Sequence, residues 1–199
     1  MAIAIRYVIV YVKGRIIMNT TAKRELNVKE KSGLQVKDLL LVGILLAAGA
    51  VLKFFVGSII NIGGMKPNFI IAMYCLAILL IKPKLQYAAI IGILAGAICQ
   101  FFPGTPYLNF ASEILGAVAM CLLIRLPIKF GKVNLTPIVA AFISTLISGF
   151  TYTIELLVFT HAAKETLFVY APIVLCTAAI NCIIVQLAYI PLNSVINKE

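Results

Sequence analysis

Six apolar segments, separated by short gaps, constrain the fold of this chain more than any other feature. Apolar residues make up 62% of the sequence, more than the roughly 45–50% of soluble domains, so lipid must solvate much of the surface. A helix crosses a bilayer with about 20 mostly apolar residues, and with fewer inside a bundle. We therefore predict an all-α membrane protein, a compact bundle of six transmembrane helices at residues 38–60, 67–82, 86–102, 108–125, 135–159 and 169–192.

The positive charges predict the orientation of this bundle. With six spans, all of the 17 Lys and Arg residues except Lys53, Lys66 and Lys164 fall on the side of the two termini. The positive-inside rule then places both termini in the cytoplasm. Residues 1–37 form a cytoplasmic N-terminal tail, 38–192 the six-helix membrane domain, and 193–199 a cytoplasmic C-terminal tail. Residues 1–17 precede a second methionine, Met18, and it stays open whether they reflect an upstream start codon.

The sequence lacks the motifs of common enzymes. It has no GxxxxGK[ST] loop to bind ATP phosphates and no HExxH or GxSxG motif. The five cysteines lie in apolar runs without CxxC spacing, which argues against a metal site. The net charge of +10 resides mainly in the N-terminal tail and the short gaps, as in cytoplasmic loops. We expect no enzymatic activity, no cofactor, no metal and no nucleic-acid partner.

Ionisable residues inside the apolar segments predict a polar pocket. Lys53, Glu113 and Glu155 each fall in the outer part of a span, and charges at such positions are usually functional. Other polar and aromatic residues recur at steps of three or four, so that they share a helix face with these charges. The sets are Ser148, Tyr152, Glu155 and Phe159 in the fifth span, Asn109, Glu113 and Met120 in the fourth, and Tyr170, Thr177 and Asn181 in the sixth.

Such a pocket suits an amphiphilic zwitterion. Either Lys66 or Lys53 is placed to bind a substrate carboxylate, and either Glu155 or Glu113 to bind an ammonium group. The side chains that would sandwich an aromatic ring are Tyr107, Tyr152, Phe159 and Tyr170. A structural interpretation stays open for each group: the lysine of the first span would snorkel to the interface, the carboxylates would satisfy internal groups, and the aromatics would pack in the core.

The first span carries a stripe of small residues. Gly43 and Ala47 form a small-xxx-small pair, and Ala50 extends the same face. Such faces let two helices approach closely. Two interpretations are open, namely packing inside this chain and docking onto a partner membrane subunit.

These features together resemble the substrate-binding S components of energy-coupling factor (ECF) transporters, over about residues 38–192. The stretch Gly63-Gly64-Met65-Lys66-Pro67-Asn68-Phe69 and the run Leu45–Leu52 are similar to the TrpP-like tryptophan transporter group. The resemblance implies a multi-pass protein of the bacterial plasma membrane. It would bind tryptophan and work with a transmembrane T component and two ATPase subunits.

The resemblance also implies roles for particular residues. The loop 61–67 would cover the pocket, with Lys66 on the substrate carboxylate and Asn61 and Met65 in the binding set. Asn109 or Gln100 would accept the indole N–H. Gly43 and Ala47 match the Ala-x-x-x-Ala docking motif, with Gly in place of the first Ala. Some members have Asp where this chain has Asn68, a difference that bears on substrate preference.

Three other functions stay open at this point. Ranked in order behind the tryptophan interpretation, they are an S component for a vitamin or another aromatic precursor, a solitary ion-coupled transporter using Glu113 or Glu155, and a membrane scaffold that binds no ligand.

Overall fold

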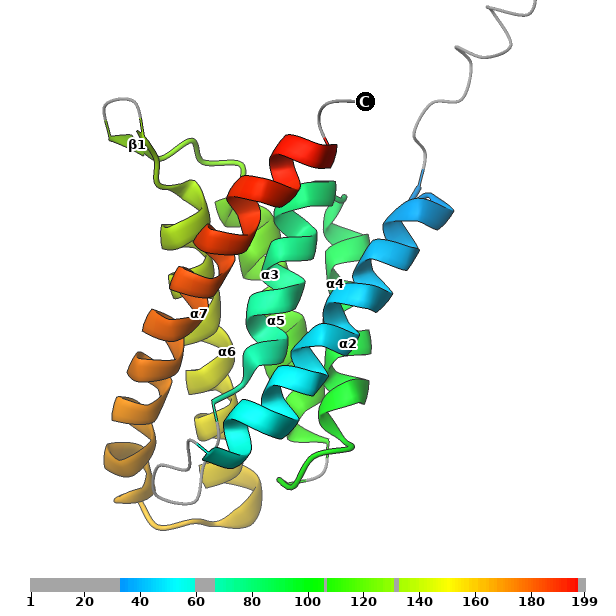
Figure 1. Cartoon of the computed structure of the whole chain (residues 1–199). Coiled ribbons are helices and arrows are strands. Elements are labelled where there is room, and N and C mark those ends of the chain that lie inside the picture. The colour runs from blue at the N-terminus through cyan, green and yellow to red at the C-terminus, as the bar shows by residue number, and fades with distance from the viewer. Residues whose placement is uncertain (1–32, 60–66, 106, 131–132, 197–199) are drawn as a thin grey trace, which may run out of the picture. The chain divides into compact units, whose positions relative to one another are not determined.

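The computed structural model describes residues 33–59, 67–105, 107–130 and 133–196 (Figure 1). Residues 36–199 form one compact unit, and its described residues form six helices and one small hairpin. Its elements are α2 (Val36–Ile59), α3 (Phe69–Ile81), α4 (Leu85–Cys99), α5 (Leu108–Leu123), β1 (Lys129–Phe130), β2 (Val133–Asn134), α6 (Thr136–Thr160) and α7 (Thr166–Ile196).

All six predicted helical segments are confirmed in the described residues. The last helix is longer than predicted, since it begins at Thr166 and ends at Ile196. The sequence did not predict the strands, which pair antiparallel in a small hairpin with Lys129 opposite Asn134. This hairpin joins α5 to α6 at the end of the bundle where α2 begins and α7 ends (Figure 1).

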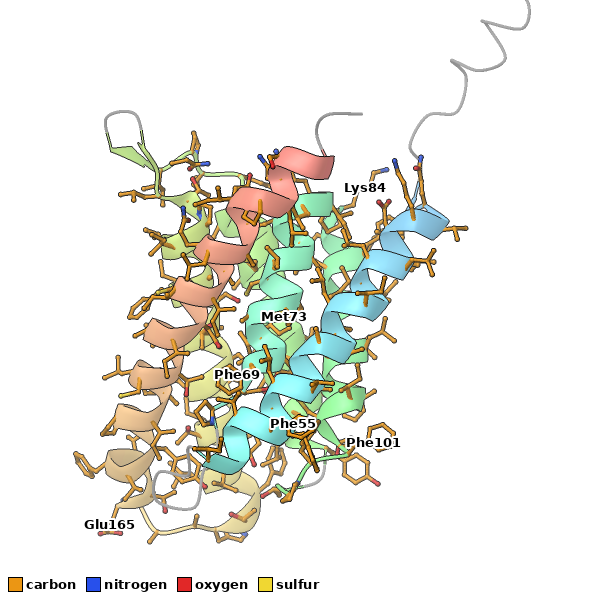
Figure 2. All side chains as sticks on the ribbon, in the orientation of Figure 1. Phe55, Phe69, Met73, Lys84, Phe101 and Glu165 are labelled. Atoms are coloured by element: carbon orange, nitrogen blue, oxygen red, sulfur yellow. The ribbon has the colours of Figure 1, made fainter. Side chains whose placement is uncertain are left out.

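Helix α3 forms the centre of the bundle. It contacts each of the other five helices, and every residue from Phe69 to Leu79 is buried. Its sequence explains this position, because a helix that is apolar on all sides has no face suited to water. Figure 2 shows Phe69 and Met73 on α3, between α2 and α7.

The helices differ in their ability to cross a bilayer by themselves. Three are long and apolar enough to do so, covering Val36–Val56, Thr136–Thr160 and Thr166–Ser194, whereas α3, α4 and α5 are shorter. The 13 residues of α3 rise only about 20 Å, against about 30 Å of hydrocarbon. Because protein surrounds α3 on all sides, its short length leaves little backbone facing lipid.

Two glycines bring α4 and α5 into backbone contact. A Cβ added to Gly92 would lie 2.7 Å from the Cα of Ile114, and one added to Gly96 would lie 2.9 Å from the Cα of Phe110. These distances are shorter than real Cβ contacts, so only glycine permits this packing. The consequence for function is that Glu113, next to Ile114, is held close to α4.

The small-residue pair Gly43 and Ala47 of α2 faces outward instead. A Cβ added to Gly43 would meet nothing within 4 Å, and Ala47 is exposed while Ala50 is half-buried. The described residues of this chain therefore do not use the Gly43 position for internal packing.

Candidate binding pocket

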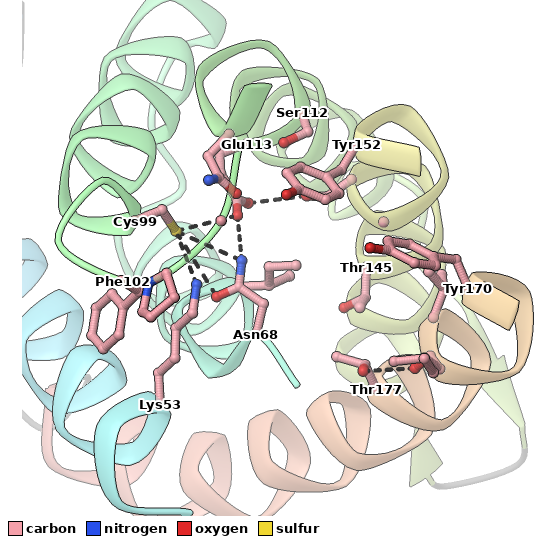
Figure 3. Close-up of a pocket in the computed structure, with 18 residues that line it drawn as sticks. Lys53, Asn68, Cys99, Phe102, Ser112, Glu113, Thr145, Tyr152, Tyr170 and Thr177 are labelled. Atoms are coloured by element: carbon pink, nitrogen blue, oxygen red, sulfur yellow. Dashed lines mark hydrogen bonds between the residues drawn. The ribbon is translucent and has the colours of Figure 1, made fainter. Parts of the chain in front are cut away.

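A cavity of about 190 Å³ lies near the end of the bundle opposite the start of α2. It is bounded by the last turns of α2 and α4, the loop that follows α4, the first turns of α3, α5 and α7, and the middle of α6. Figure 3 shows the side chains that enter it. Those with charged, polar or aromatic groups are Lys53, Asn68, Cys99, Phe102, Asn109, Ser112, Glu113, Thr145, Ser148, Tyr152, Tyr170 and Thr177.

The carboxylate of Glu113 is the most enclosed charged group in the cavity wall. Its side chain is 1% exposed, and both of its oxygens accept hydrogen bonds. The amide Nδ2 of Asn68 donates to Oε1 at 2.5 Å, and the hydroxyl of Ser148 donates to Oε2 at 3.0 Å. A buried carboxylate needs such donors, because its desolvation is otherwise uncompensated. The two bonds fix the carboxylate between α3 and α6.

Asn68 reaches Glu113 because it does not cap its own helix. It occupies the N-cap position of α3, where Asn ordinarily accepts a bond from the first helical turn, but its side chain makes no cap hydrogen bond. The amide turns toward α5 instead. Asn181 of α7 steadies this arrangement by donating from Nδ2 to the backbone oxygen of Asn68 at 3.1 Å.

Cys99 of α4 contacts Glu113, Asn68 and Lys53. Its sulfur lies 3.7 Å from the Oε1 of Glu113 and 3.7 Å from the Nδ2 of Asn68. The ammonium group of Lys53 donates to the same sulfur at 3.6 Å. The same ammonium lies 4.9 Å from the ring centroid of Phe102, a favourable position over an aromatic face.

A polar network thus receives one or more members from each of the six helices. They are Lys53 from α2, Asn68 from the start of α3, Cys99 from α4, Glu113 from α5, Ser148 and Thr145 from α6, and Asn181 from α7. We define this set as the six-helix network. Because no single helix holds it, its geometry depends on the arrangement of the whole bundle.

Two tyrosines form the wall across the cavity from Lys53. Figure 3 shows the rings of Tyr152 and Tyr170 on the side of α6 and α7. The hydroxyl of Tyr152 accepts a hydrogen bond from the backbone N–H of Thr105 at 3.4 Å, which ties the ring to the loop between α4 and α5. The cavity therefore has a charged side and an aromatic side.

The structure gathers some predicted site residues and separates others. Glu113, Asn109 and Tyr152 line the cavity, together with Lys53, and Asn181 lies next to it through its bonds to Asn68 and Thr145. The loop residues Lys66, Asn61 and Met65 lie outside the described residues.

Several other predicted residues do not line the cavity. Tyr107 is 77% exposed and Phe159 is 70% exposed. Glu155 shares a helix face with Tyr152 but lies one turn nearer the end of α6, and its Oε2 is buried without a hydrogen-bond partner in the described residues. Gln100, the alternative indole acceptor, uses its amide in the connection from α4 to α5. It donates to the oxygen of Gly96 and accepts from the N–H of Tyr107, each at 3.1 Å.

Sequence reasoning missed Cys99, Ser112 and Thr145, and treated Asn68 only as a family difference. The first three lie in apolar runs, where a small side chain suggests packing. In the described residues no group of three or more His, Cys, Asp or Glu side chains is placed to hold a metal ion.

Comparison with known proteins identifies similar chains. The family model described as "Tryptophan transporter TrpP" matches residues 35–197. A "Probable tryptophan transport protein" of Bacillus subtilis (strain 168) is 26% identical over 168 residues, which cover 83% of this chain and 96% of that protein. No solved structure matches the chain.

Proposed function

The chain belongs to the family of the tryptophan transporter TrpP, and from this premise we propose that the cavity is a tryptophan-binding site. The observation that carries the proposal is the pairing of a charged side with an aromatic side in one cavity. Lys53 and Glu113 supply opposite charges, while Tyr152 and Tyr170 face them. A zwitterionic head group and an indole ring need these two environments next to each other.

The size of the cavity favours an amino acid over a large vitamin. Pockets for drug-sized ligands measure about 300–1,000 Å³, and this cavity holds about 190 Å³. The polar groups that face it also include the amide of Asn109, which we propose as an acceptor for the indole N–H. A buried acceptor of this kind would disfavour phenylalanine, which has no N–H to offer.

We further propose that the chain is the S component of an ECF-type importer. The sequence has no GxxxxGK[ST] loop, so energy would come from separate ATPase subunits through a T component. The open face at Gly43 and Ala47 supports docking of that component on α2. With both termini cytoplasmic, as the positive charges predict, the cavity opens toward the outside of the cell.

A binding assay tests the proposed substrate directly. The chain contains no Trp, so the fluorescence of bound tryptophan can be followed without a protein indole signal. We expect purified full-length protein to bind tryptophan saturably, and to bind riboflavin, thiamine, biotin and folate much more weakly. Saturable binding of one of these vitamins with no response to tryptophan would refute the substrate assignment.

A transport assay tests the proposed energy source. In proteoliposomes that contain this chain alone, an imposed proton or sodium gradient should drive no tryptophan uptake. Uptake should require co-reconstitution with a T component, two ATPase subunits and ATP. Gradient-driven uptake by the chain alone would instead establish an ion-coupled carrier, for which the buried Glu113 is the natural proton site.

A further inference from the structure

Lys53 and Glu113 are opposite charges that the structure holds close together without direct contact. Both contact the sulfur of Cys99, at 3.6 Å from the ammonium and 3.7 Å from Oε1. The two side chains form no ion pair within 4.0 Å. Figure 3 shows the sulfur with contacts to both groups. A single thiol therefore links the cation and the anion of the cavity.

This separation is unusual for opposite charges in a largely apolar bundle. Opposite charges attract more strongly in a medium of low dielectric constant, and the long flexible side chain of lysine allows it to move toward a carboxylate. Two features oppose that movement. Asn68 and Ser148 hold both oxygens of Glu113, and Phe102 holds the ammonium over its ring. The sulfur of Cys99 contacts both charged groups.

An α-amino acid carries a carboxylate and an ammonium group on one carbon atom. It can therefore contact a cation and an anion at once only if these are held a short distance apart. An ammonium group has three N–H donors, and Lys53 directs one to sulfur and faces a ring with the others. A substrate carboxylate would replace these weak contacts with charge-assisted hydrogen bonds.

We propose that Lys53 binds the carboxylate and Glu113 the ammonium group of an α-amino acid, and that Cys99 is a positioning residue that keeps the two charges apart. This inference rests on the proposed function, because it assigns the orientation of the substrate in the same cavity. The head group lies on the side of α2, α4 and α5. The side chain of the amino acid then extends toward Tyr152 and Tyr170.

Ligands that lack one charge test the orientation. Tryptamine has no carboxylate and indole-3-propionate has no ammonium group. Wild-type protein should bind tryptophan about 10- to 100-fold more tightly than either, as expected for loss of one charged hydrogen-bonding partner. Equal affinity for all three ligands would overturn the proposal without the need for any variant.

Two substitutions then assign each charge. Lys53→Met should weaken tryptophan binding about 10- to 100-fold, while tryptamine binding stays unchanged or improves, because a repelling cation is removed. Glu113→Gln keeps the shape of the side chain and should show the converse, with tryptophan weakened and indole-3-propionate unchanged or tighter. A merely structural role would weaken all ligands in parallel, and that outcome overturns the proposal.

Substitutions of Cys99 test its role as a spacer. In Cys99→Ala the ammonium of Lys53 can reach Glu113, so tryptophan affinity should fall about 10-fold. Cys99→Ser retains a polar atom between the charges and should recover part of that loss. The matched control is Cys121→Ala, which removes a buried thiol that bonds the oxygen of Pro83 away from the cavity. Wild-type affinity in Cys99→Ala would refute the spacer role.

The results separate this inference from the proposed function. If wild-type protein binds no tryptophan, the proposed function itself fails. If it binds tryptophan but the ligand series and the variants show no charge-specific pattern, only the orientation and the role of Cys99 are refuted.

Discussion

Replacement of Gly116 by Ala should destabilise the bundle at its centre. A Cβ at this position would lie 2.2 Å from the hydroxyl oxygen of Tyr74 and 2.9 Å from the Cβ of Ser148. Tyr74 is fully buried in α3, which the other helices surround, so its ring has little room to move. Both contacts are shorter than real Cβ atoms show, and one or both neighbours must shift.

The structure allows an estimate of the stability lost in Gly116→Ala and predicts that a second substitution restores part of it. Overpacking of a well-packed core typically costs about 1–3 kcal/mol, and two simultaneous clashes place Gly116→Ala near the upper value. A loss of about 3 kcal/mol corresponds to a fall in melting temperature of about 6–12 °C for a chain of this size. Tyr74→Phe removes the clashing oxygen, which has no hydrogen-bond partner in the described residues, and should be nearly neutral alone. In the double variant about half of the loss should return, because the clash with Ser148 remains.

Thermal unfolding of wild type, the two single variants and the double variant, purified in one detergent, tests this prediction. The matched control is Gly43→Ala, where the added Cβ meets nothing within 4 Å, so its melting temperature should equal or slightly exceed that of wild type. The reasoning is wrong if Gly116→Ala has the same melting temperature as wild type, or if adding Tyr74→Phe to it restores no stability.

Three further predictions concern the pocket and the two glycine faces. Ser148→Ala should weaken the free energy of tryptophan binding by about 1–3 kcal/mol, because a buried carboxylate oxygen loses its donor. Ser148→Thr retains the hydroxyl and should bind tryptophan more like wild type, which titration of both variants checks. Gly92→Leu should prevent packing of α4 against α5. Gly43→Leu should leave the melting temperature unchanged and abolish co-purification with a T component. The opposite pattern would mean that the Gly43 face packs inside the chain and the Gly92 face docks the partner. Lys66→Ala, outside the described residues, should weaken tryptophan binding about 10- to 100-fold, and an unchanged affinity by calorimetry would remove it from the site.

Hydrophobic patterning predicted the six helices because their signal is collective. Each segment contains many apolar residues, so no single residue decides its assignment. The ionisable residues were informative for a similar reason, since a charge within an apolar span needs a partner. Glu113 and Lys53 accordingly lie in the cavity wall.

Depth along a helix was harder to predict than the face of a helix. Glu155 and Phe159 share the angular position of Tyr152, as their spacing indicates, but they lie beyond the cavity toward the end of α6. Helical periodicity gives the direction of a side chain and carries no information about where a neighbouring helix ends. The same limit explains Cys99, whose part in the site depends on contacts from α2, α3 and α5 that are distant in sequence.

The two small-residue motifs show another limit of the sequence. Gly92 and Gly96 in α4 have the same spacing as Gly43 and Ala47 in α2, yet the first pair packs against α5 and the second faces outward. Spacing identifies a surface that permits close approach and does not identify its partner.

Helix α2 connects the outward face with the pocket, and this arrangement has a thermodynamic consequence. Lys53 lies ten residues after Gly43, about 15 Å along the same helix. A partner that shifts α2 on docking would therefore move Lys53 relative to Glu113, which other helices hold in place. If docking weakens tryptophan binding in this way, linkage requires tryptophan to weaken docking by the same factor. Saturating tryptophan should then reduce the affinity for the T component in wild type, and should have little effect in Lys53→Met; an equal effect in both would show that the coupling does not pass through this side chain.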